Sequence, residues 1–223
     1  MDGGSLIFPS DSDPDHQRTF DAHYIFLNNG SYMEIGTEAN PYTSKMTLTM
    51  WGSRYDPYIP KFGNKVIGVR KSTLDMHGVV RDKTWTSLQS TALVGATSIT
   101  LVEDVDWKRD EEIVIASTDL GIEDNEIAGE GDRSEKRKIT GINGRVISFT
   151  DALLYEHYAN TDTYGDVNIE MRAEVGLLTR NVKYQGDPET SRTDKYGATI
   201  MIHSPGDESS VGRISYAEFF NVG

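Results

Sequence analysis

Short runs of alternating apolar and polar residues, separated by Gly, Asn and Asp, recur along almost the whole chain. In KMTLTMWG (45–52), Met46, Leu48 and Met50 fall on one face, and the lysine and threonines fall on the other. Alternation with a period of two is typical of a half-buried strand, and the intervening residue types are typical of turns. The sequence shows no convincing helical periodicity over about ten residues or more. We therefore expect an all-β chain without a substantial helix.

Further strands are expected in runs of the same kind, at 5–8, 24–27, 31–36, 65–69, 73–78, 97–102, 112–117, 144–149, 167–178, 181–186, 198–204 and 212–220. Two polar stretches, 11–19 and 119–137, interrupt the pattern and are expected to be long surface loops. Such a chain can form a sandwich, a barrel or a β-solenoid. The solenoid is favoured because NNGSYMEIG, RKSTLDMHG and GINGRVISF each give a polar or glycine corner followed by a strand.

Composition excludes several classes of partner. The 22 basic and 35 acidic residues give a net charge of −13, which repels phosphate backbones, so we expect no nucleic-acid partner. No apolar run approaches the ~20 residues of a membrane span, so this segment is expected to make no direct membrane insertion. The opening MDGG lacks the basic and apolar regions of a signal peptide. The absence of cysteine excludes disulfides and thiolate metal sites.

Several long phrases resemble a known family. NNGSYMEIGTEANPYTSKMTLTMWG, KFGNKVIGVRKSTLDMHG and WTSL, in that order, resemble the eight-glycine (G8) domain. DEEIVIAST, EMRAEVGLLTRNVKYQGDPE and YGATIMIH resemble the fibrocystin and fibrocystin-like branch, in which that domain runs into a parallel β-helix. The cell-migration-inducing hyaluronidases are more distantly similar. The sequence departs from the family pattern at Trp51, at Asn29-Gly30 and at Ser72, which stands where a corner glycine is expected.

The resemblance implies a right-handed parallel β-helix in an extracellular or cell-surface ectodomain. We expect residues 1–94 to form a G8 domain whose first strands are missing. Residues 95–223 are expected to form connecting strands and the first β-helix coils, continuous with that domain. The chain is accordingly expected to be a fragment without a signal peptide of its own.

The strand TLDMHG places Asp75 and His77 on one face and Leu74 and Met76 on the other. Asp75 could orient His77 as a base, with Arg70 nearby to bind an anion. The alternative is a half-exposed strand with a polar face, which is the default for a sheet. A catalytic triad is not supported by the spacing. His203 ends another strand and would face a groove with His77 only if the coils bring the two together.

A second polar face is formed by Glu170, Arg172 and Glu174. Residues i and i+4 of a strand lie about 13 Å apart, which is too far for the paired carboxylates of a glycosidase. A structural ion-pair ladder that fixes the register between coils is therefore favoured.

Acidic stretches raise the question of calcium. Asp11, Asp13 and Asp15 alternate, but they lack the central Gly and terminal Glu of an EF-hand loop. The long acidic loop supplies Asp119, Asp124 and Glu126 as weak calcium candidates, and a solvated loop is the simpler interpretation. None of the five histidines forms a zinc-type pair. We therefore expect no cofactor.

Aromatic residues near turns can stack on sugar rings or can cap a core. Trp51, Tyr55 and Trp85 are the candidates for glycan contact. Asn29-Gly30-Ser31 is a glycosylation sequon on an expected turn.

Together these features favour a non-catalytic recognition or scaffold module. Its partners would be an extracellular glycan or protein, or neighbouring segments of the same large protein. The alternatives are a polysaccharide-depolymerising, hyaluronidase-like enzyme and a structural segment of a filament or surface appendage, because the fold alone does not choose among them.

Overall fold

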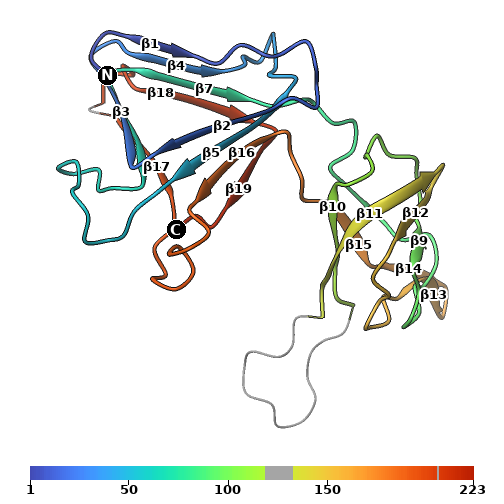
Figure 1. Cartoon of the computed structure of the whole chain (residues 1–223). Helices are drawn as coiled ribbons and strands as arrows, with labels where there is room; N and C mark the ends of the chain where they lie inside the picture. The colour runs from blue at the N-terminus through green and yellow to red at the C-terminus, as the bar shows by residue number, and fades with distance from the viewer. Residues whose placement is uncertain (119–132, 205) are drawn as a thin grey trace. The chain divides into compact units, whose positions relative to one another are not determined.

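The computed structural model describes residues 1–118, 133–204 and 206–223, and every regular element in them is a β-strand (Figure 1). The described residues contain no helix, so the all-β expectation is confirmed. They also contain no helix long and apolar enough to cross a membrane. The chain divides into unit 1, residues 1–80 and 180–223, and unit 2, residues 81–179.

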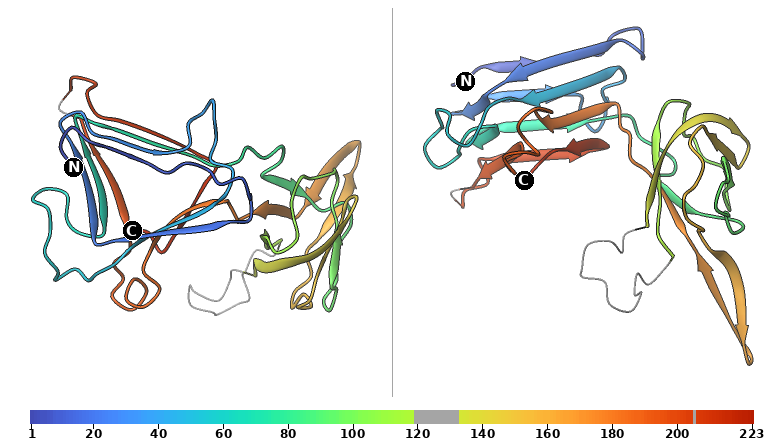
Figure 2. Two further views of the ribbon diagram at one scale, coloured as in Figure 1. Left: turned by 45° about the horizontal axis from the view of Figure 1, so that its top comes forward. Right: turned by 60° about the horizontal axis from the view of Figure 1, so that its bottom comes forward.

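Unit 1 is built from three parallel sheets, which form the sides of a triangle in Figure 1. The first sheet contains β1 (Ser5–Ile7), β4 (Tyr32–Ile35), β7 (Thr73–His77) and β18 (Val211–Ser215). The second contains β2 (Gln17–Ala22), β5 (Lys45–Met50), β16 (Val182–Gly186) and β19 (Ala217–Phe220). The third contains β3 (Tyr24–Asn28), β6 (Val66–Arg70) and β17 (Thr199–His203). Because the chain visits the three sheets in the same order each time, consecutive strands form a three-sided coil (Figure 2).

The register of the parallel strands stacks apolar side chains inside this coil. In the second sheet Leu48 lies between Phe20 and Tyr184, and in the first sheet Met33 pairs with Leu74. Leu48, Met33, Leu74 and Tyr184 are fully buried. The predicted inward faces of 45–52 and 73–78 are therefore confirmed. A slip of one residue would expose a whole row, so burial fixes the register.

The corners of the coil differ in detail from the family pattern. Asn29 and Lys71 have left-handed backbone conformations, with φ of 54° and 49°. Ser72, at the expected glycine position, is buried, and its Oγ accepts a hydrogen bond from the Ser31 amide at 3.1 Å. This hydroxyl therefore satisfies a buried backbone donor that a glycine would leave without this partner.

Unit 2 is antiparallel. Its six-stranded sheet runs in the order β8 (Trp85–Ser87), β15 (Glu174–Leu177), β10 (Glu112–Ile115), β11 (Glu135–Asn143), β12 (Val146–Phe149), β9 (Ser98–Thr100). The bridge between Leu88 and Leu101 joins the two ends of that order, so the sheet closes on itself. A separate hairpin contains β13 (Ala159–Tyr164) and β14 (Val167–Arg172). Buried residues such as Ile113, Ile147 and Val175 fill the interior of unit 2.

Residues 95–223 are expected to form connecting strands and the first β-helix coils, continuous with the first domain, and much of that range instead belongs to the antiparallel unit 2. Within that range only the segment from residue 180 onward adds parallel strands to the coil, and the expected boundary at 94 and 95 falls inside unit 2. The phrase GINGRVISF, interpreted as a coil corner, is a hairpin between β11 and β12, with Gly144 at φ 56°. The two loop residues are Gly144 and Arg145, and glycine with positive φ at the first loop position is typical of a type II′ hairpin turn, which favours the antiparallel outcome.

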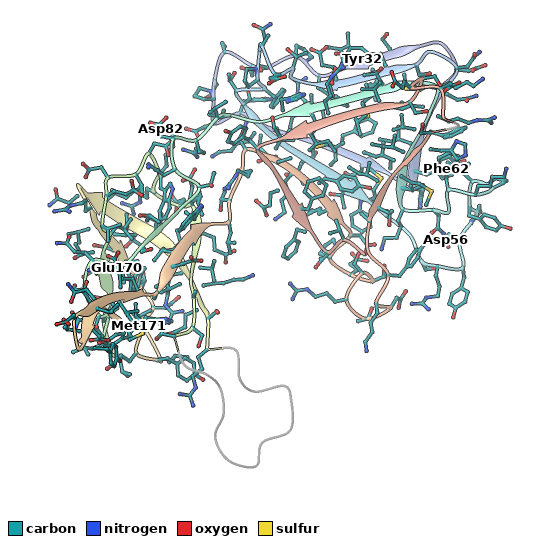
Figure 3. The ribbon with its side chains drawn as sticks, turned by 180° about the vertical axis from the view of Figure 1, so that it is seen from behind. Tyr32, Asp56, Phe62, Asp82, Glu170 and Met171 are labelled. Atoms are coloured by element: carbon teal, nitrogen blue, oxygen red, sulfur yellow. The ribbon has the colours of Figure 1, made fainter. Side chains whose placement is uncertain are left out.

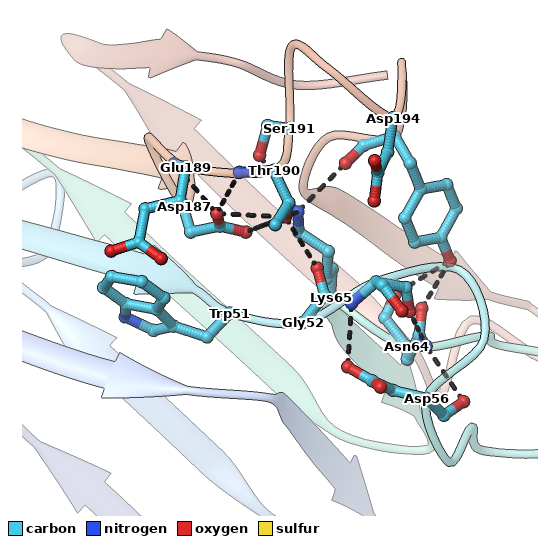
Figure 4. Close-up of polar contacts among 12 residues, drawn as sticks. Trp51, Gly52, Asp56, Asn64, Lys65, Asp187, Glu189, Thr190, Ser191 and Asp194 are labelled. Atoms are coloured by element: carbon cyan, nitrogen blue, oxygen red, sulfur yellow. Dashed lines mark hydrogen bonds and ion pairs between the residues drawn. The ribbon is translucent and has the colours of Figure 1, made fainter.

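A buried ion pair joins two loops of unit 1 (Figure 4). Lys65 is fully buried, and its ammonium donates to Asp187 Oδ2 at 2.6 Å, Ser191 Oγ at 2.9 Å and the Tyr196 carbonyl at 3.0 Å. The other oxygen of Asp187 accepts the Thr190 amide at 2.7 Å. Burial opposes the ionisation of Asp187, but the hydrogen bonds from Lys65 and Thr190 outweigh it and hold the pKa of Asp187 below 3.8. Removal of one partner from such a pair costs about 3–5 kcal/mol.

A substitution at Gly78 tests how closely the backbone after β7 packs against Asn181 and Tyr216. An alanine Cβ there would lie 2.7 Å from Asn181 Oδ1 and closer still to the Tyr216 carbonyl. Gly78→Ala is expected to lower the free energy of unfolding by about 1–3 kcal/mol, because the neighbours must move. Gly4→Ala is the control, since its nearest neighbour, Met1 Cε, lies 3.7 Å away. Equal urea midpoints for the two variants would contradict the packing described here.

Asp187→Asn tests the buried pair through its pH dependence. The variant is expected to lose about 3–5 kcal/mol near neutral pH. Because the pKa of Asp187 is lowered in the folded state, its contribution is present above 3.8 and is lost as pH falls through the folded-state pKa. The difference between wild type and variant, measured by urea denaturation, should therefore shrink below pH 3.8. A difference that stays constant under acid conditions would argue against an ionised Asp187.

Candidate functional site

A groove in unit 2 runs beside strand β8. It has a volume of about 350 Å³ and is lined by Asp82, Lys83, Thr84, Trp85, Thr86, Ser87, Val102 and Glu103. The alternation of β8 explains the position of Trp85, because Thr86 points inward and is buried whereas Trp85 points outward and is 59 % exposed. Trp85 therefore lines the groove together with several polar residues.

Glu103 is the charged centre of this groove. Its Oε2 lies 2.8 Å from Lys83 Nζ, and its Oε1 accepts the Thr86 hydroxyl at 3.0 Å. The hydrogen bonds from Lys83 and Thr86 lower the pKa of Glu103, so the carboxylate is ionised at neutral pH. Glu103 and Lys83 are each less than half exposed, so both also face solvent. The groove therefore offers an acceptor, a cationic donor and an aromatic surface, a combination that suits a polyhydroxylated ligand.

A second polar cluster lies on the outer face of the first sheet of unit 1. Asp75 is 2 % exposed and is not a solvent-facing residue, in contrast to the half-exposed alternative. Arg213 binds it through two hydrogen bonds, Nε to Oδ1 at 2.6 Å and Nη2 to Oδ2 at 2.9 Å. The hydroxyl of Tyr32, which is labelled in Figure 3, lies 2.9 Å from Asp75 Oδ2 and 2.6 Å from Glu34 Oε2.

These contacts set the charge of the cluster. Burial opposes the ionisation of Asp75, but the hydrogen bonds from Arg213 and Tyr32 outweigh it and keep the pKa of Asp75 below 3.8. Burial and the two carboxylates raise the pKa of Tyr32 well above 10. Since the phenol has one proton, it can donate to only one of the two carboxylates at a time. Asp75 is thus a stable anion that holds an arginine.

His77 lies beside this cluster. Its Nδ1 is 2.8 Å from Ser215 Oγ, and its Nε2 is 3.8 Å from Asp75 Oδ1. A distance of 3.8 Å is too long for a hydrogen bond, and within the described part of the chain Nε2 is buried without a hydrogen-bond partner. Serine, histidine and aspartate are therefore near one another, but Asp75 is engaged by other groups and does not orient the ring.

The other residues of the predicted catalytic set lie elsewhere in unit 1. Arg70 ends β6 in the third sheet, where its register partner is His203 of β17. Both side chains are exposed, and neither belongs to the sheet that carries Asp75 and His77. The guanidinium that binds Asp75 is that of Arg213.

The predicted ladder is interrupted. Arg172 Nε forms an ion pair with Glu170, but Glu174 lies beyond Ala173 on β15, in a different sheet. The expected strand at 167–178 is thus two strands. The Glu170–Arg172 pair lies on an antiparallel hairpin, so it does not fix the register between coils.

The remaining candidates are dispersed. Trp51 donates its indole N–H to Asp21 at 3.1 Å, and Tyr55 is 89 % exposed in the loop after β5. Asn29 is exposed at the turn between β3 and β4, and the Ser31 hydroxyl of the sequon is bonded to the Asn28 carbonyl at 2.7 Å.

Some of the calcium candidates have local hydrogen-bond or ion-pair partners, and the others lie outside the residues that the structure describes. Asp11 and Asp13 each accept the backbone amide two residues onward, and Asp15 pairs with Lys45. Asp119, Asp124 and Glu126 lie outside the described residues. Among the residues that the structure does describe, no group of three or more His, Cys, Asp or Glu could hold a metal ion.

Sequence reasoning missed Arg213, Tyr32, Ser215 and Glu103. The first three reach Asp75 and His77 only through stacking of strands far apart in the chain, since Asp75 and Arg213 are separated by 138 positions in the sequence. Spacing carries no signal for such a contact. Glu103 lies 18 residues after Trp85, and only closure of the antiparallel sheet brings the two to one groove.

Comparisons with known proteins agree with the resemblance seen in the sequence. The family model described as "G8 domain" matches residues 1–89. Fibrocystin-L of Mus musculus is 33 % identical over 259 residues, which cover 100 % of this chain and 6 % of that protein. Fibrocystin of Canis lupus familiaris is 30 % identical over 191 residues, which cover 85 % of this chain and 4 % of that protein. Among solved structures, the Pseudomonas phage phi297 tailspike gp61 aligns with 89 % of this chain and 27 % of that chain, with a TM-score of 0.37 and 10 % identity.

The matched segment includes the first seven strands of unit 1 and strand β8 of unit 2. Strands from outside the match continue its sheets, because β16 pairs with β5, β17 with β6 and β18 with β7. The coil therefore extends beyond the family segment. Residues 1–89 form a G8 domain, in a chain that is related to fibrocystin-L along its whole length.

Proposed function

We propose that this chain is a non-catalytic extracellular recognition module and that the groove beside Trp85 binds a glycan. Trp85 is exposed and lines the same groove as the ionised Glu103 and its partner Lys83, and this is the observation that carries the proposal. A sugar ring presents an apolar face that can stack on the indole and hydroxyls that can bond to both charged groups. The relationship to fibrocystin-L and the sequon at Asn29 support the extracellular setting.

Trp85→Ala tests the glycan site. Wild type is expected to bind a subset of glycans on an array, and the variant is expected to lose about tenfold or more in affinity for them, because the stacking surface is gone. Trp85 is exposed, so the variant should keep the thermal midpoint of the wild type. Tyr55→Ala, which removes an exposed aromatic ring from unit 1, is the matched control and should bind as wild type does. An unchanged array profile for Trp85→Ala, or no binding by wild type, would refute the proposal.

A depolymerising enzyme is the second candidate, and the group of Ser215, His77 and Asp75 favours it. Register also pairs Glu34 with Asp75, so two carboxylates lie on neighbouring strands, as a glycosidase requires. The electrostatics argue against this role. The arginine-bound, depressed-pKa Asp75 is a poor general acid, and His77 is not oriented by a carboxylate.

Incubation with high-molecular-weight hyaluronan and other acidic or neutral glycans, with and without Ca²⁺, distinguishes the two candidates. We expect no change in polymer length over time, measured by size-exclusion chromatography. Time-dependent shortening that is abolished by Asp75→Asn or His77→Ala would establish the enzyme instead. Both variants need a check of their thermal midpoint, because both side chains are buried.

We further propose that the coil of unit 1 is a right-handed parallel β-helix. Crossovers between parallel strands of one sheet are right-handed in about 98 % of cases. The repeated visits to three parallel sheets support this assignment.

A further inference from the structure

Strand β14 of the β13–β14 hairpin carries a row of apolar side chains on one face and polar side chains on the other. Val167, Ile169 and Met171 alternate along β14 and so share a face, which Tyr164 joins as the register partner of Val167. These four side chains are 40–60 % exposed. Asn160 and Asp162 of β13 lie on the same face as this row, opposite Met171 and Ile169. The other face carries Ala159, Thr161, Thr163, Asn168, Glu170 and Arg172.

The base of the hairpin is anchored to the rest of unit 2. Arg172 donates to the carbonyls of Leu88 and Gln89, and the Ala159 amide donates to Thr91 Oγ1 at 3.0 Å. Beyond this base the two strands extend from the six-stranded sheet of unit 2 (Figure 2), and Glu170 and Met171, labelled in Figure 3, lie on this extension. Within the described residues, β13 and β14 pair only with each other, so the outer edge of β14 is unpaired.

Two strands alone are marginally stable in water, whereas three strands with an apolar face form a stable sheet. An unpaired edge next to an apolar row offers both backbone hydrogen bonds and cross-strand packing to an incoming strand. The apolar residues of that strand would extend the row of Val167, Ile169 and Met171. Its other residues would lie beside Asn168 and Glu170 on the polar face.

Charge indicates what kind of strand fits. The hairpin holds three carboxylates, Asp162, Asp166 and Glu170, and one cation, Arg172, which pairs with Glu170. Its net charge is therefore 1 − 3 = −2, in a chain of net charge −13. A second copy of this chain would bring the same acidic groups to the edge, and like charges on adjacent strands are destabilising. We propose that the β14 edge of this hairpin is a docking site for a strand of a partner protein in which apolar residues alternate with Lys or Arg. This inference goes beyond the glycan groove and uses none of the residues that line it.

Three synthetic peptides test the docking site on the full chain: VKVKVKV, VEVEVEV and SKSKSKS, each with blocked ends. VKVKVKV is expected to bind and to shift the backbone amide resonances of residues 167–171 in NMR spectra. SKSKSKS has the same charge without the apolar residues, so binding by general charge attraction would affect both peptides equally. VKVKVKV is expected to bind about tenfold more tightly than either of the other peptides, because it alone satisfies both faces.

Ile169→Thr with Met171→Thr removes the apolar row but keeps strand-forming residues, and it should weaken VKVKVKV binding about tenfold. Asn168→Thr on the polar face and Trp85→Ala in the groove are controls that should leave peptide binding unchanged. Should the double variant unfold, Val167→Thr near the tip of the hairpin replaces it. Binding that is insensitive to these variants, equal binding of the three peptides, or no binding at about 1 mM peptide would overturn the proposal. Self-association of the wild type that the double variant abolishes would overturn it as well, in favour of a second copy.

Discussion

The stacking of parallel strands in register is the constraint on which unit 1 depends. Each apolar residue that points inward lies above a counterpart one coil away, as Ile25 does with Ile67 and Met46 with Val182. Backbone hydrogen bonds set the spacing of the coils, and burial of these rows sets their register. The same register aligns the outward-facing residues of neighbouring strands. Glu34, Asp75 and Arg213 therefore form a row across three strands.

This alignment explains why polar residues are buried on the outside of the first sheet. A carboxylate beside an arginine in the next coil can be covered, because its charge is compensated and its oxygens are bonded. Lys65 and Asp187 apply the same principle at a corner, where an ammonium with three acceptors holds two loops together. Such residues resemble catalytic sets in the sequence, but their partners give them a structural role.

Unit 1 buries Asp75 and the pair of Lys65 and Asp187, whereas unit 2 exposes side chains that could bind a ligand. Its antiparallel strands leave an indole, a carboxylate and an ammonium on an open groove, and its hairpin leaves an apolar row and a free edge. Antiparallel strands can be joined by tight turns and can carry a polar face toward water. An antiparallel unit within a coiled chain can therefore present binding groups without disturbing the stacked rows that stabilise the coil.

The sequence by itself determined the strand content and the inward residues of the clearest strands, because alternation reports directly which side chains face a core. It also determined the family, through phrases long enough to be specific. Alternation is the same in parallel and antiparallel strands, so only the tertiary structure decided that 95–179 would not join the coil, although Gly144-Arg145 carried a local hairpin signal. Tertiary structure likewise decided that Asp75 binds Arg213 and that Trp85 shares a groove with Glu103. These pairs form only when segments distant in the chain are brought into register. The spacing of residues in the sequence does not predict which distant segments will pair.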